Sequence, residues 1–163
     1  MTFWAAANRA RLRSPARHET VYAPAFRREI EELHQNGVRM QVIGDDFLVT
    51  NAALVREAAA GGACNAVLLK PNQAGTVTET VRAMQAAREA GWGMVVSARS
   101  GETEDVAIVH LATGWNTGQL KVGSFARSER MAKWNEGLRV EQQIGPGAAY
   151  AGGSVLPASR GNG

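Results

Sequence analysis

Short, wholly apolar runs that alternate with helical patterns constrain the fold of this chain most strongly. Residues 66–69 (Ala-Val-Leu-Leu) are apolar at every position, so they lack the inside–outside alternation of a half-solvated strand. Residues 94–96 (Met-Val-Val) have the same character, and an amphipathic stretch over 76–90 separates the two runs. Strands without alternation, separated by helices, indicate a parallel sheet covered by helices.

The same pattern extends over most of the chain. It predicts strands at residues 38–43, 66–69, 93–97 and 119–121, and helices at residues 25–35, 52–60, 76–90, 102–112 and 127–143. The predicted fold class is therefore α/β, and four successive strand–helix units form either half of a (β/α)8 barrel or a small open sheet.

Polar residues stand at or just beyond the carboxyl end of each predicted strand. They are Asp45, Lys70, residues 97–100 and Lys121. Each has an ordinary explanation by itself, as a turn residue or a solvated strand end. Together they favour an active site, because a parallel barrel carries its catalytic groups at the carboxyl edge of the sheet.

These side chains suit chemistry on a phosphorylated small molecule. The Asp45 carboxylate is a ligand type that Mg²⁺ prefers, although one carboxylate is too few for a complete site. Lys70 can serve as a base if apolar walls and a second cation, Lys121, surround it. Arg99 and Ser100, on a turn before a predicted helix, can hold a phosphate. The set predicts proton abstraction beside a carboxylate.

Composition narrows the class of protein. A length of 163 residues fits one domain with a modest core, and no apolar run is long enough to predict a membrane span. Cys64 is the only cysteine, so an internal disulfide is excluded, which agrees with a cytoplasmic location.

The two ends differ from the middle of the chain. Residues 1–24 are basic and predict a disordered leader, with a targeting segment or a nucleic-acid-binding arm as alternatives. Nucleic-acid binding is disfavoured because no aromatic residues interleave with the arginines at stacking spacing. Residues 25–145 form the expected folded domain, and residues 146–163 are rich in Gly, Ala and Ser and predict a flexible tail.

Several longer motifs stand out along the chain. They include residues 42–46 (Val-Ile-Gly-Asp-Asp), 68–73 (Leu-Leu-Lys-Pro-Asn-Gln), 97–105 (Ser-Ala-Arg-Ser-Gly-Glu-Thr-Glu-Asp), 117–121 (Thr-Gly-Gln-Leu-Lys) and 127–130 (Arg-Ser-Glu-Arg). Together these motifs resemble the carboxyl-terminal part of enolases (phosphopyruvate hydratases). The resemblance covers roughly residues 25–152 and implies the carboxyl-terminal half of an enolase-type TIM barrel.

The resemblance also implies individual roles. Asp45 matches the last of three magnesium-binding carboxylates, and Lys70 matches the base that removes the proton alpha to the carboxylate of 2-phosphoglycerate. Lys121 matches the lysine that binds the substrate carboxylate. Arg99 and Ser100 match the phosphate-binding pair.

Ser97 belongs to the same substrate loop, and Ala98 departs from the family pattern there. Enolases carry a histidine at the position of Ala98, and that histidine contacts substrate. An alanine offers neither a proton nor a hydrogen bond. Losing such a contact typically lowers a rate by about 10²–10⁴.

The resemblance implies that this chain is incomplete alone. The family's lid domain and four earlier strands carry the general-acid glutamate and two further magnesium carboxylates, and residues 1–37 hold no counterpart. A half barrel also leaves open sheet edges. We therefore expect the isolated chain to be inactive, with a second chain or another copy of itself completing the barrel.

Three functions remain open at this point. The first is an incomplete enolase that converts 2-phosphoglycerate to phosphoenolpyruvate and water in glycolysis. The second is an enolase-like subunit of a carboxyphosphonoenolpyruvate synthase in phosphonate biosynthesis, in which Ala98 suits a changed substrate. The third is a catalytically inactive remnant or interaction protein.

Overall fold

A computed structural model describes residues 28, 31–33, 35–37 and 40–156 of the chain. The strands are β1 (Ile43–Gly44), β2 (Ala66–Leu69), β3 (Gly93–Ser97) and β4 (Leu120–Lys121). The helices are α2 (Ala52–Gly61), α3 (Pro71–Ala74), α4 (Val77–Glu89), α5 (Ala107–Gly114) and α6 (Ser128–Ile144), followed by the 3-10 turns η2 (Gly145–Gly147) and η3 (Gly152–Val155). The predicted basic leader lies outside the described residues, as does part of the predicted helix over 25–35.

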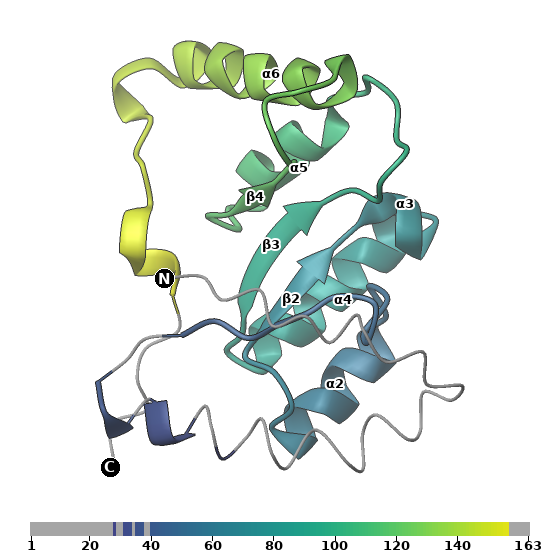
Figure 1. Cartoon of the computed structure of the whole chain (residues 1–163), viewed down its shortest axis with the longest axis vertical. Helices are drawn as coiled ribbons and strands as arrows, with labels where there is room; N and C mark the ends of the chain where they lie inside the picture. Colours follow the sequence, from purple (N-terminus) through teal and green to yellow (C-terminus); the bar gives the residue numbers. More distant parts are fainter. Residues whose placement is uncertain (1–27, 29–30, 34, 38–39, 157–163) are drawn as a thin grey trace.

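The four strands form one parallel sheet in chain order, β1-β2-β3-β4. Helix α4 covers β2 and β3, α2 packs on α4, and α5 lies between β3 and α6. Figure 1 shows α2 and α6 at opposite ends of the molecule, with the curved sheet between them. The predicted α/β class is confirmed, and the sheet formed by the described residues is open rather than a closed barrel.

Close contact between β2 and α4 forms the centre of the core. Val67 and Leu69 of β2 are fully buried, as are Ala83 and Ala87 of α4. Alanines four residues apart share one helix face, and their small side chains allow the helix to approach the sheet closely. The hydroxyl of Thr76 accepts a hydrogen bond from Glu79 N (3.1 Å), which fixes the start of α4.

The first strand is shorter than the predicted range of 38–43. Among the described residues, 40–42 have no strand structure, because the side chain of Asn65 occupies their backbone groups. Its Oδ1 accepts from Val42 N (2.7 Å), and its Nδ2 donates to Met40 O (2.9 Å). An amide side chain thus replaces part of the expected strand ladder.

The helix predicted over 102–112 begins later, at Ala107, and ends at Gly114. Two side-chain hydrogen bonds hold the preceding residues in a turn. Thr103 Oγ1 accepts from Asp105 N (3.3 Å), and Asp105 Oδ1 accepts from Ala107 N (2.8 Å). Short polar side chains that bind nearby backbone amides compete with helix formation, so residues 101–106 remain a loop.

None of the helices among the described residues is long and apolar enough to cross a membrane.

The core is closely packed around Gly44, at the end of β1. A β-carbon at Gly44 would lie 2.3 Å from Leu48 Cδ1 and 2.6 Å from Leu48 Cγ. Leu48 is only 1% exposed, so it cannot move aside freely.

We expect Gly44→Ala to lower the free energy of unfolding by about 1–3 kcal/mol, because overpacking forces neighbouring side chains out of place. The matched control is Gly61→Ala at the end of α2, where an added β-carbon meets nothing within 4 Å. Urea denaturation of both variants measures the difference. Equal stability of the two variants would contradict this account of the packing.

Candidate active site

Lys70 and Asp45 form an ion pair at the carboxyl edge of the sheet. Lys70 follows β2 and Asp45 follows β1, so the parallel pairing of these strands brings the two residues together. Lys70 is 7% exposed, and the Asp45 side chain is 25% exposed. An ammonium group this deeply buried needs a partner, and the carboxylate supplies it.

Thr50 forms a hydrogen bond with the backbone of Lys70. Its hydroxyl accepts a hydrogen bond from Lys70 N (3.0 Å) and lies 2.8 Å from Gln73 Oε1, to which it donates. Thr50 is 2% exposed and has a φ of 54°, an uncommon value for a β-branched residue. Its strained backbone places the hydroxyl under the backbone of Lys70.

The one-turn helix α3 connects the loops around the site. Its first residue, Pro71, directly follows Lys70. Asn72 Oδ1 accepts from Arg99 N (3.1 Å), and Gln73 Nε2 donates to Asp46 Oδ1 (3.3 Å). Sequence reasoning assigned no role to Thr50, Asn72 or Gln73. Asn72 and Gln73 lie in the motif around Lys70, and Thr50 lies four residues after the motif around Asp45, so closeness to these motifs is the signal that could have identified them.

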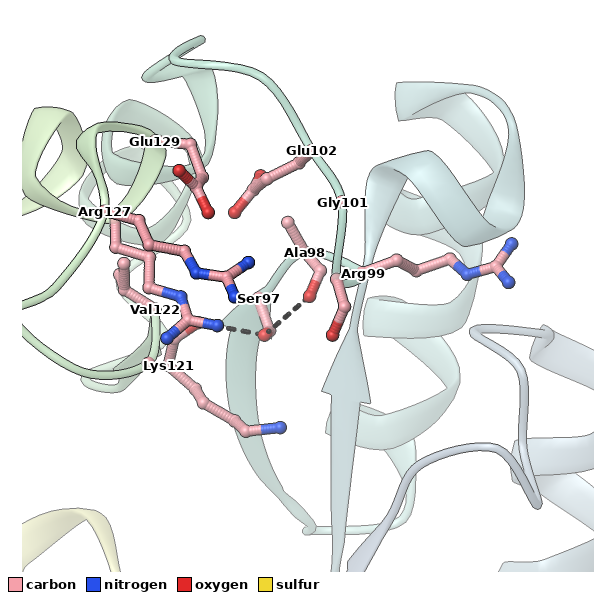
Figure 2. A pocket seen from close by; sticks show the side chains of 12 residues that line it. Ser97, Ala98, Arg99, Gly101, Glu102, Lys121, Val122, Arg127 and Glu129 are labelled. Carbon is pink, nitrogen blue, oxygen red and sulfur yellow. Dashed lines mark hydrogen bonds between the residues drawn. The ribbon is translucent and has the colours of Figure 1, made fainter.

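A second cluster forms a pocket of about 150 Å³ between the loop after β3 and the start of α6 (Figure 2). Its lining residues are Ser97, Ala98, Arg99, Ser100, Gly101, Glu102, Lys121, Val122, Gly123, Arg127, Glu129 and Arg130. Apart from Arg99, three cationic side chains outnumber two carboxylates in this lining, so the pocket favours an anion.

Ser97 joins the ends of two strands at this pocket. Its hydroxyl donates to the carbonyl of Lys121 (2.9 Å), which lies opposite Ser97 in the β3–β4 register. Figure 2 shows the side chain of Arg99 pointing away from those of Glu102 and Arg127. The backbone of Arg99 is therefore at the pocket, while its guanidinium extends outward.

The predicted site residues thus fall into two groups at one edge of the sheet. Asp45 and Lys70 form one group, and Ser97, Ala98, Ser100 and Lys121 line the pocket with Arg99. The hydrogen bond from Arg99 N to Asn72 links the groups, because Asn72 belongs to the helix that follows Lys70.

The described residues supply an incomplete set of metal ligands. They contain no group of three or more His, Cys, Asp or Glu side chains that could hold a metal ion. Asp45 can offer one carboxylate to Mg²⁺, and magnesium commonly takes its other ligands from substrate oxygens and water.

Cys64 takes no part in this site. Burial raises the pKa of its thiol to about 12, so the reactive thiolate is disfavoured.

A parallel sheet covered by helices, with polar side chains gathered at its carboxyl edge, is the arrangement of part of a β/α-barrel domain. Residues 25–159 match the family model described as "Enolase, C-terminal TIM barrel domain". The chain therefore belongs to the enolase C-terminal TIM barrel family.

Two similar curated proteins support this assignment. The chain is 52% identical over 118 residues to "Enolase" of Solanum lycopersicum, a match covering 72% of this chain and 27% of that protein. It is 53% identical over 116 residues to "Enolase 2" of Hevea brasiliensis, covering 71% and 26%. The chain thus spans about a quarter of the length of these relatives.

We expect Thr50→Val to lower the free energy of unfolding by about 1–3 kcal/mol, because it leaves the buried Lys70 N–H without its acceptor. Thr113→Val is the matched control. The Thr113 hydroxyl bonds only the carbonyl of Val109 in its own helix (3.0 Å), and the residue is exposed. Its cost should stay within about 0.5 kcal/mol. Thermal denaturation compares the stability of the two variants. Similar losses of stability would show that the Thr50 hydrogen bonds contribute little.

Proposed function

We propose that this chain supplies the carboxyl-terminal part of an enolase-type active site, which converts 2-phosphoglycerate to phosphoenolpyruvate and water. The observation that carries this proposal is the buried Lys70 beside Asp45, next to a cationic pocket at the same sheet edge. Both features occur in a chain that belongs to the enolase barrel family.

Lys70 is the proposed base. Its Nζ, in the neutral amine form after giving up a proton of the Asp45-paired ammonium, would accept the proton from the carbon alpha to the substrate carboxylate. The resulting negative charge requires nearby cations, and Lys121 at the end of β4 is the proposed partner of the substrate carboxylate. Ser100 and Arg99 are the proposed phosphate ligands, with Ser97 supporting the same loop. The Arg99 guanidinium points outward in this structure (Figure 2), so it would have to turn toward the pocket to bind phosphate. The departing hydroxide would leave as water, with a proton from an acid that these residues do not supply.

Magnesium is the proposed cofactor, and Asp45 would contribute one of its carboxylate ligands. When bound, the ion would add positive charge close to the developing dianion. The remaining ligands would come from substrate, water and other parts of a complete enzyme.

A partner that completes the barrel is part of the proposal. Strands β1 and β4 are the edges of the described sheet, and unpaired edges tend to bind further strands. A second polypeptide that carries the preceding barrel strands would fit, as would another copy of this chain. We propose that the completed enzyme works in the cytoplasm, in glycolysis.

The isolated chain should not convert 2-phosphoglycerate when Mg²⁺ is present, because Lys70 lacks an acid on the opposite side of the substrate. The ultraviolet absorbance of phosphoenolpyruvate follows the reaction. Robust turnover by the purified 163-residue chain would refute the proposed dependence on a partner.

A chimera tests the roles of Lys70 and Ala98 in a complete barrel. The segment of the Solanum lycopersicum enolase that matches this chain would be replaced with the segment from this chain. We expect turnover about 10²–10⁴ below that of the parent enzyme, because Ala98 provides no polar contact. In the chimera, Ala98→His should recover most of this loss, and Lys70→Met should abolish the remaining activity.

The control is Arg56→Met, which removes a cation whose side chain is 57% exposed and paired with Glu89 on the outer face of the helices. Its turnover should equal that of the unmodified chimera. Activity that survives Lys70→Met would refute Lys70 as the base. A folded chimera that stays inactive after Ala98→His would favour an inactive remnant.

A further inference from the structure

Lys133 of α6 is a lysine with no exposed surface that none of the proposed chemistry uses. Its Nζ donates to Glu129 O (2.8 Å) and to Thr103 O (2.9 Å), and it lies 3.3 Å from Glu102 Oε2. An ammonium group has three N–H donors, and Lys133 has three acceptors. The buried charge is therefore fully partnered.

These three acceptors belong to two different segments. Glu102 and Thr103 lie in the loop after β3, and Glu129 lies in the first turn of α6. The same two segments form facing walls of the cationic pocket, and both Glu102 and Glu129 line it (Figure 2). Lys133 therefore joins the two walls from behind the ligand space.

The loop after β3 has a second attachment, on the other side of Gly101. Arg99 N is bonded to Asn72, whereas Glu102 and Thr103 are bonded to Lys133. Gly101 lies between them with a φ of 82°, a conformation that glycine adopts readily. Two fixed points around a glycine define the path of the segment that carries Ser100.

The charges around Glu102 favour a cation at the position of Lys133. Burial raises the pKa of the Glu102 carboxyl, the Lys133 ammonium lowers it, and the nearby carboxylates of Glu129 and Asp105 raise it again. Figure 2 shows the carboxylates of Glu102 and Glu129 pointing toward one another. Lys133 supplies a positive charge beside Glu102 that opposes the repulsion between these carboxylates.

We propose that Lys133 is a positioning residue that sets the distance between the substrate loop and α6, and so fixes the pocket for a phosphate group. This inference rests on the proposed function, because it assumes that the pocket takes a phosphorylated ligand. Lys133 itself does not line the pocket and would touch no ligand.

The test compares Lys133→Met with the double variant Lys133→Met/Glu102→Met. The single change leaves the half-buried Glu102 carboxylate without its cation, whereas the double change removes both charges and should restore stability. Amide hydrogen exchange over residues 99–106 measures loop order, and calorimetric titration with inorganic phosphate measures binding. All measurements are made at a temperature at which thermal denaturation shows that each variant is folded.

We expect loop exchange to become at least about tenfold faster and phosphate affinity to fall at least about tenfold in both variants, because both lose the hydrogen bond to Thr103. The double variant is the more stringent test. Removing the negative charge of Glu102 would by itself raise the affinity for phosphate, so a fall in affinity would have to come from the loss of Lys133. Arg139→Met is the control. It removes an exposed cation of α6 that pairs with Glu136 (2.8 Å), and it should change neither quantity.

Unchanged loop exchange in the folded variants would overturn the proposal, and so would faster exchange with unchanged phosphate affinity. If Lys133→Met alone does not fold, the double variant decides in the same way. Recovery of phosphate affinity together with stability in the double variant would show a purely structural role. If the unmodified chain binds no phosphate, the assignment of this pocket to a phosphate group fails, while loop exchange still decides whether Lys133 holds the loop.

Discussion

The parallel pairing of β2 with both of its neighbours is the constraint on which the rest of the site depends. All four residues of β2 are buried, so this strand can lie only in the middle of a covered sheet. Parallel pairing places the carboxyl ends of β1 to β4 at one edge. Asp45, Lys70, Ser97 and Lys121 meet there because of strand direction, although they lie far apart in the sequence.

Buried polar groups with charged or hydrogen-bonded partners then hold the loops at this edge. The Lys70 ammonium pairs with Asp45, and the Lys70 backbone amide donates to Thr50. Lys133 performs the corresponding task between the loop after β3 and α6. Such groups are costly when a partner is lost, so each permits few alternative arrangements. A site held in this way before a ligand arrives avoids part of the cost of ordering it.

Sequence periodicity predicted the parallel α/β fold, and it failed where side chains, near or distant in the sequence, bind the backbone. The strand expected over 38–43 is shortened at its described residues because Asn65 bonds Val42 and Met40. The helix expected from 102 starts at Ala107 because Asp105 accepts its first amide. The hydrophobic pattern of a sequence indicates which residues are buried. These hydrogen bonds depend instead on which side chains the fold, or a single turn, brings close to the backbone.

The sequence by itself determined the four strand–helix units and the chain's membership of the enolase barrel family. It could do so because apolar periodicity and motif spacing are local properties of the chain. Only the tertiary structure decided that Asp45 pairs with Lys70, that α3 links this pair to the substrate loop, and that Lys133 joins the two walls of the pocket. Those contacts connect residues 25 to 30 positions apart, and packing of the helices on the sheet brings them within hydrogen-bonding distance.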